Sequence, residues 1–91
     1  MSVNVRLPTM LRPFANGDRS VASDGSTVGD VVVELIDSYP AMKPNLVDDA
    51  GALHRFVNVY VNDEDVRYLD RLDTVLVDGD ELSILPAVAG G

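Results

Sequence analysis

Residues 78–91 read DGDELSILPAVAGG and contain a turn, a strand and a chain end of two glycines. The turn is expected at 78–80, because glycine adopts positive φ angles and aspartate side chains bond nearby backbone groups. The strand is expected at 82–85, where apolar residues alternate with a serine before a proline. We therefore expect a folded domain over residues 1–86 and a flexible C-terminal tail over residues 87–91.

One amphipathic helix is expected over residues 28–39. Its apolar residues recur at intervals of three and four, the spacing that places them on one helix face, and that face should pack against a sheet. Thr27 can cap the helix N-terminus, with Asp30 three residues later. Pro40 ends the helix, because the residue before a proline avoids the α region. The apolar face consists of Val28, Val31, Val32, Leu35, Ile36 and Tyr39.

Alternating apolar residues predict four further strands, with turns between them. Asn16-Gly17 predicts a turn with positive φ, residues 62–65 predict another turn, and one helical turn is expected near 45–47 within the connection 41–53. The order strand, strand, helix, strand, strand, strand predicts an α+β fold, with a mixed sheet packed on one main helix. This is the β-grasp arrangement of ubiquitin. The further strands are expected at 3–7, 19–23, 56–61 and 66–68.

The composition describes one small acidic domain without cysteine. The chain has 91 residues and a net charge of −8, and 46% of its residues are hydrophobic, which supports one compact core. The acidic balance argues against a nucleic-acid partner, and the lack of cysteine excludes disulfides, thiolate metal sites and a cysteine nucleophile. Since there is neither a run of about 18 apolar residues nor a signal pattern, we expect a cytoplasmic protein with no membrane partner.

The tail carries the candidate reactive group. Val88 and Ala89 lead to Gly90 and Gly91, and the missing Cβ atoms of the glycines let the chain enter a narrow channel. Five extended residues span about 17 Å, enough to reach a buried active site in another protein. The terminal carboxylate is ionised near neutrality and resists nucleophiles until it is activated. Gly91 is therefore the residue whose carboxylate such a tail would carry into another protein.

A docking surface is expected on the sheet face that the helix leaves uncovered. Side chains alternate along a strand, so Leu85, Phe56 and Tyr60 should all point away from the helix. Three large apolar groups on one open face favour a partner-binding patch, and acidic surroundings would suit a partner groove with a basic rim. Two other interpretations stay open: a loop covers these residues, or they are scattered surface residues.

The remaining polar residues give no catalytic or metal site. His54 is the only histidine, and without cysteine or a second histidine it supports neither a zinc site nor a catalytic triad. The acidic residues at 48–49 and 63–65 lack the spacing of a calcium-binding loop and are interpreted as solvated turns. The arginines are scattered along the sequence, so no basic patch is expected.

The expected helix, the run 78–86 and the Val88–Gly91 end together resemble the ubiquitin-like sulfur carriers of the MoaD/ThiS family. The resemblance covers nearly the whole chain. The segments 53–67 and 85–91 are most similar to the CysO-type carriers of bacterial cysteine biosynthesis.

This resemblance implies a protein co-substrate rather than an enzyme, with no cofactor bound to it. An E1-like adenylating enzyme of the MoeB/ThiF type would use ATP to adenylate Gly91, and sulfide or a persulfide would then leave a C-terminal thiocarboxylate. In the cysteine branch, a PLP-dependent cysteine synthase accepts this sulfur, and a metalloprotease releases the product.

Other functions within the resemblance stay open. The chain could serve molybdopterin, thiamin or a sulfur-containing secondary metabolite, or act as a ubiquitin-like protein modifier. Thiamin carriers are usually shorter and lack much of 41–53, and molybdopterin-synthase small subunits often have two prolines where this chain has Pro86-Ala87. Lys43 is the only lysine, which argues against lysine-linked polymers of this chain.

Overall fold

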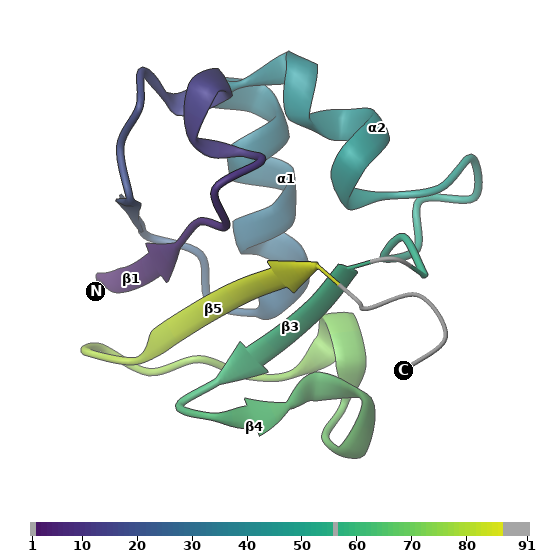
Figure 1. The fold of residues 1–91 in the computed structure, drawn as a ribbon. Coiled ribbons are helices and arrows are strands. Elements are labelled where there is room, and N and C mark those ends of the chain that lie inside the picture. The colour runs from purple at the N-terminus through teal and green to yellow at the C-terminus, as the bar shows by residue number, and fades with distance from the viewer. Residues whose placement is uncertain (1, 56, 87–91) are drawn as a thin grey trace.

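The computed structural model describes residues 2–55 and 57–86, which form one mixed sheet against one long helix, α1 (Val28–Ser38) (Figure 1). The sheet has five strands in the order β2-β1-β5-β3-β4. β1 and β5 run parallel, whereas the other neighbours are antiparallel. The predicted mixed sheet on one main helix is therefore confirmed. The strands are β1 (Val3–Arg6), β2 (Ser20–Ser23), β3 (Val57–Val61), β4 (Glu64–Asp65) and β5 (Glu81–Pro86).

The core lies between α1 and the inner face of the central strands. In β5, Leu82 pairs with Val5 of β1 and Val61 of β3, and Ile84 pairs with Val59. All five side chains are buried. The alternation of apolar and polar residues along the strands thus places the apolar set on the helix side, as the sequence predicts.

Helix α1 begins at the predicted cap. The Thr27 hydroxyl oxygen accepts a hydrogen bond from the backbone N–H of Asp30 at 3.1 Å, which satisfies one of the unpaired donors in the first turn. A second contact ties the helix to the sheet: the buried Ser23 hydroxyl, at the end of β2, donates to Glu34 Oε2 at 2.9 Å. The helix is fixed by one polar contact at its start, by another near its middle, and by its apolar face.

Two short helical segments begin the connection between α1 and β3. The 3₁₀ helix η2 (Pro40–Met42) runs into α2 (Lys43–Leu46), which stands where one helical turn was expected near 45–47. Met42 and Leu46 are fully buried, so this segment closes the core at the end of α1. Pro40 and Pro44 each lie in the first turn of their helical segment, where the backbone N–H has no intrahelical partner, so its absence loses no hydrogen bond.

The turn after β3 is shorter than expected. Asn62 and Asp63 have φ angles of 49° and 72°, the pair of positive values that makes a two-residue hairpin turn. Pairing therefore resumes at once, with Glu64 opposite Val61. Residues 64–65 belong to β4 and not to the turn.

The strand expected at 66–68 is wrong, because these residues form a 3₁₀ helix, η3 (Val66–Tyr68). A local side-chain contact decides the outcome. The Asp65 carboxylate accepts the backbone N–H of Arg67 at 2.9 Å and caps the helical turn. A second 3₁₀ helix, η4 (Arg71–Asp73), follows.

The turn at 78–80 has the predicted mechanism. Gly79 has a φ of 88°, which suits glycine. The Asp80 carboxylate accepts the backbone N–H of Val77 at 2.9 Å and the side-chain amide of Asn62 at 2.8 Å. This one side chain therefore joins the turn before β5 to the turn after β3.

Replacing Thr27 with alanine should destabilise the domain by about 1 kcal/mol, because the first turn of α1 loses its cap. Thr27→Ser is the matched control, since it keeps the accepting oxygen. Urea unfolding followed by circular dichroism measures both free energies. Equal free energies of unfolding for the two variants would contradict the capping role.

Candidate functional site

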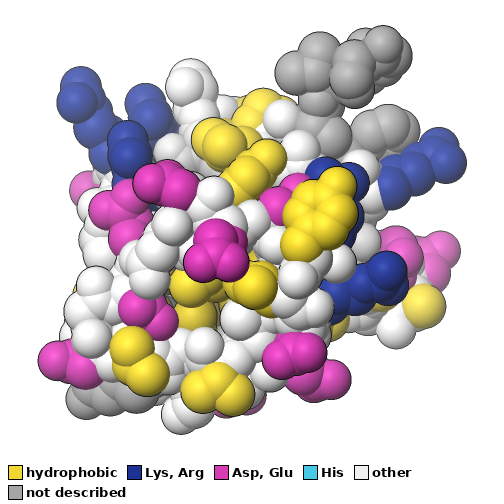
Figure 2. All heavy atoms as spheres, turned by 90° about the horizontal axis from the view of Figure 1, so that it is seen from below, with side chains coloured by type: hydrophobic (Ala, Val, Ile, Leu, Met, Phe, Trp, Pro, Cys, Tyr) yellow, Lys and Arg dark blue, Asp and Glu magenta, His cyan; other side chains and the backbone are white. Residues whose placement is uncertain are grey.

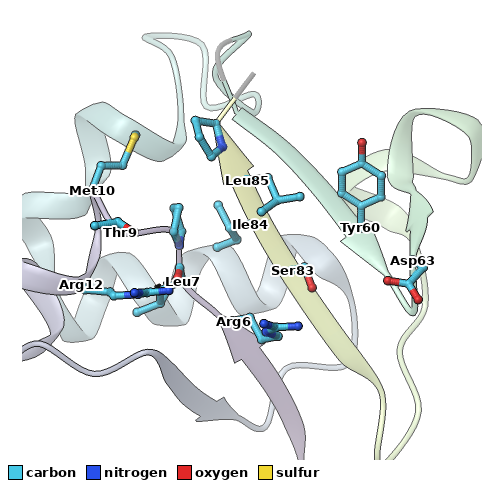
Figure 3. A pocket seen from close by; sticks show the side chains of 12 residues that line it. Arg6, Leu7, Thr9, Met10, Arg12, Tyr60, Asp63, Ser83, Ile84 and Leu85 are labelled. Atoms are coloured by element: carbon cyan, nitrogen blue, oxygen red, sulfur yellow. Dashed lines mark hydrogen bonds between the residues drawn. The ribbon is translucent and has the colours of Figure 1, made fainter. Parts of the chain in front are cut away.

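The uncovered face of the sheet carries a hollow of about 660 Å³ beside the end of β5 (Figure 3). Leu85 and Tyr60 project into it from β5 and β3, and Met10 lies on the opposite wall, in the segment that follows β1. We call this region the open-face hollow. It combines apolar side chains from two strands and one loop that are far apart in the sequence.

Leu85 and Tyr60 point away from α1, as predicted. Tyr60 pairs with Ser83, two residues before Leu85 on β5, so the two side chains are diagonal neighbours on one face. Leu85 is 47% exposed, and Tyr60 is half-buried. The described loops therefore leave Leu85 open to solvent, and Met10, which is 45% exposed, extends the apolar surface. The role of these residues in partner binding stays a prediction.

Backbone hydrogen bonds and a buried leucine hold the loop that forms one side of the hollow. The Leu7 N–H donates to the Arg19 carbonyl at 2.8 Å, and the Leu11 N–H donates to the Pro8 carbonyl at 2.9 Å. Leu11 is fully buried and precedes the 3₁₀ helix η1 (Arg12–Ala15). Because Leu11 anchors the loop in the core, the neighbouring Met10 stays on the surface. The long loop after β1 is thus held in a defined position, and it forms one side of the hollow.

The charges around the hollow differ from those expected. Arg6 forms an exposed ion pair with Glu81 at 3.6 Å, and Arg12 Nε donates to the Leu7 carbonyl at 3.2 Å. Both arginines line the hollow, together with one acidic residue, Asp63 (Figure 3). The expected acidic surroundings are therefore wrong at this place. The reason is that the surface positions of β1 and its loop carry arginine, while the acidic excess lies elsewhere.

The described part of the chain ends with β5. Pro86 is the last residue of β5 and lies opposite Val57, the first residue of β3. The predicted reactive end, Gly91, and the tail residues Val88, Ala89 and Gly90 lie outside the described residues, and so does Phe56. Their predicted roles remain predictions.

A second hollow, of about 470 Å³, lies along β3, η3 and η4. It brings together arginines that are scattered in the sequence, and aspartates from the same segments balance them. No periodicity signals this cluster, because it depends on how η3 and η4 fold back on β3. Its charged and ionisable lining residues are His54, Arg55, Asp65, Arg67, Asp70, Arg71 and Asp73.

One ion pair in this second hollow is well defined. The Arg67 guanidinium donates to the Asp65 carboxylate at 2.7 Å through Nη2 and at 3.2 Å through Nε. These hydrogen bonds, and that from the Arg67 backbone N–H, hold the pKa of Asp65 below its ordinary value. The pair stabilises the local turn.

Within residues 2–55 and 57–86, no three acidic, histidine or cysteine side chains are placed to hold a metal ion. No helix in this part of the chain is long and apolar enough to cross a membrane. What the site offers is a shaped apolar surface beside the end of a central strand.

Comparisons with known proteins agree with this arrangement. Residues 5–91 match the ThiS family. The sulfur carrier protein CysO of Mycobacterium tuberculosis is 50% identical over 93 aligned residues, with all of both chains covered. Its crystal structure superposes with a TM-score of 0.88 over 94% of this chain and 99% of that chain, at 49% identity.

Two further proteins show how wide the similarity is. A chain in the crystal structure of the Amycolatopsis orientalis BexX/CysO complex has a TM-score of 0.88 and 47% identity, over 98% of this chain and 99% of that chain. Small archaeal modifier protein 3 of Haloferax volcanii is 40% identical over 78 residues, which are 82% of this chain and 84% of that protein. The structural matches confirm the ubiquitin-like β-grasp fold.

Proposed function

The chain belongs to the ThiS family, and from this membership we propose that it is a sulfur carrier whose Gly91 carboxylate becomes a thiocarboxylate. One observation carries the proposal. The central strand β5 ends at Pro86, at the margin of the sheet, and the family match continues through the Gly90-Gly91 end. The folded domain thus provides a surface that a partner can recognise, and the C-terminal residues provide the carboxylate that the partner would modify.

The chemistry requires activation by another protein. A carboxylate is resonance-stabilised and has no good leaving group, so an E1-like adenylating enzyme would first join it to AMP and release pyrophosphate from ATP. Sulfide then attacks the acyl carbon, and AMP leaves. If a persulfide attacks instead, the acyl disulfide that forms must be cleaved by a thiol, which ends in a new disulfide and frees the thiocarboxylate. The product is a thiocarboxylate, an anion with a soft, nucleophilic sulfur. The chain itself moves no proton and is not an enzyme in this scheme.

We propose that the sulfur is used in cysteine biosynthesis, because the sequence similarity to CysO extends over the whole chain. A PLP-dependent cysteine synthase would accept the sulfur from Gly91. After an S-to-N acyl shift, cysteine would be amide-linked to the carrier, and a metalloprotease would release it. Carriers for molybdopterin, thiamin or a secondary metabolite share the first steps and differ only in the accepting enzyme.

The open-face hollow is the proposed docking surface for the activating enzyme. Leu85 lies one residue before Pro86, so a partner that covers Leu85 also holds the start of the tail. Met10 and Tyr60 add apolar contact area around it, and two arginines at the rim favour acidic groups on the partner. Docking there would direct residues 87–91 into the partner.

A second candidate function is protein modification. The 40% identity with small archaeal modifier protein 3 of Haloferax volcanii favours it, because that relative is named as a protein modifier. A modifier would form amide links between Gly91 and lysines of other proteins. Intact mass distinguishes the two outcomes: a sulfur carrier gains the mass difference between sulfur and oxygen, and a modifier gains a whole protein.

The chain should gain that sulfur-for-oxygen mass difference at Gly91 when it is incubated with ATP, an activating enzyme and sulfide. Gly91→Ala should lose most of this reaction, because a Cβ widens the chain at the reacting carbonyl. Mass spectrometry of the C-terminal peptide measures the product, and an unchanged thermal midpoint shows that the body still folds. Loading of Gly91→Ala at the normal rate would refute the requirement for glycine.

Leu85→Glu should raise the KM of the activating enzyme for this carrier by about tenfold or more, with little change in kcat, because it places a charge in the apolar docking surface. Val33→Glu is the matched control, since Val33 is 62% exposed on α1, away from the open face. Pyrophosphate release measures both constants. Equal KM values for the two variants would exclude Leu85 from the interface.

A further inference from the structure

A second apolar surface lies on the segment between η3 and β5. We call it the Val75 surface and define its apolar part as Leu69, Val75 and Val77. Val75 and Val77 are 71% and 60% exposed, more than Leu85 in the open-face hollow. The proposed docking of the activating enzyme leaves this surface unused.

The backbone explains why these side chains gather. Leu76 is buried between the two valines, and its N–H donates to the Ser26 carbonyl at 2.9 Å. Alternation along the extended chain therefore turns both valines outward on the same side. The Asp70 N–H donates to the Thr74 hydroxyl at 3.0 Å, which closes the turn between Leu69 and Val75.

The segment that carries the Val75 surface is rich in aspartate. Asp70, Asp73 and Asp78 lie in it, and Arg71 is its only basic residue, while Asp70 and Asp73 also line the second hollow beside Arg55 and Arg67. Val75 also bridges to Thr27, so the start of α1, with Asp30, lies beside it. Figure 2, which views the molecule from below, shows hydrophobic and acidic side chains over the middle of this face and most basic side chains at its margins.

The Val75 surface is separate from the open-face hollow. Val77 precedes β5 and Leu85 lies near the end of that strand, and β5 has six residues, which extend for about 20 Å. The Val75 surface also borders α1, which packs on the other face of the sheet (Figure 1). A protein bound at the end of β5 therefore leaves the Val75 surface accessible.

We propose that the Val75 surface docks a second enzyme of the sulfur-transfer sequence while the first enzyme holds the open face and the tail. This inference rests on the proposed function. Only one active site can hold Gly91 at a time, so an enzyme that waits for its turn can bind only the body of the carrier. The chemistry of the surface specifies the partner: an apolar centre surrounded by lysine and arginine.

The test compares binary and ternary complexes in analytical ultracentrifugation. Carrier, activating enzyme, a non-hydrolysable ATP analogue and the sulfur-accepting enzyme are mixed at low salt. We expect one ternary complex with the unmodified carrier. The double variant Val75→Lys, Val77→Lys should weaken it by about tenfold or more, through repulsion by the basic partner surface. Val33→Lys, an equally exposed valine on α1, should bind normally.

A second variant tests the surface without the risk that the lysine substitutions disturb folding. Asp70→Asn with Asp73→Asn leaves the apolar side chains intact, and it should weaken the ternary complex and reduce its salt dependence. Competition between the two enzymes for the unmodified carrier would overturn the proposal. So would a ternary complex that the lysine variant forms as tightly as the unmodified carrier.

Thiocarboxylate formation is measured separately on each variant. The lysine variant should be loaded at the normal rate by the activating enzyme alone. If the unmodified carrier gains no sulfur, the proposed function fails. If it is loaded and no second enzyme joins the complex, only the Val75 surface loses its role.

Discussion

The pairing of β5 on both sides is the constraint on which the rest of the structure depends. Its parallel contact with β1 covers residues 81–83, its antiparallel contact with β3 covers residues 82–86, and its inward side chains, Leu82 and Ile84, lie fully within the core. These contacts hold Pro86 at a fixed place opposite Val57. A reactive tail needs such a fixed point of departure, because a partner that recognises the body must find the chain end at a constant position. Proline at this point removes a donor and helps to stop further pairing.

The elements with regular periodicity could be predicted from the sequence. The apolar stripe and Thr27 located α1, and Asn16-Gly17 located a turn whose two φ angles are 58° and 84°. Prediction failed where a short-range polar contact outweighs strand propensity: Asp65 caps a 3₁₀ turn at Val66, so an apolar residue that looked like a strand position is buried in a helical turn. Leu85 and Tyr60 were placed on the correct face, because alternation along a strand needs no tertiary information.

The second hollow and the Val75 surface could not be predicted, because both depend on how segments that are separate in the sequence pack together. Arg55, Arg67 and Arg71 come together only after η3 and η4 fold against β3. The burial of Leu76 turns the neighbouring Val75 outward, and this depends on a tertiary contact. The result is a body whose two faces differ in charge: arginines lie at the rim of the open-face hollow, and aspartates surround the Val75 surface. A net charge of −8 conceals this division, since it sums over both faces.

The position of the N-terminus has a practical consequence. The Ser2 N–H donates to Asp78 at 2.8 Å, and the Ser2 carbonyl accepts from Gly79 at 2.9 Å, so the chain starts beside the turn that precedes β5. Pro86 stands at the other end of the same strand. Affinity tags, fluorophores or carrier fusions attached upstream of Ser2 are therefore placed about a full strand length from Pro86. Immobilisation through Ser2 keeps the support away from the end of β5, which suits surface-based binding assays of this domain.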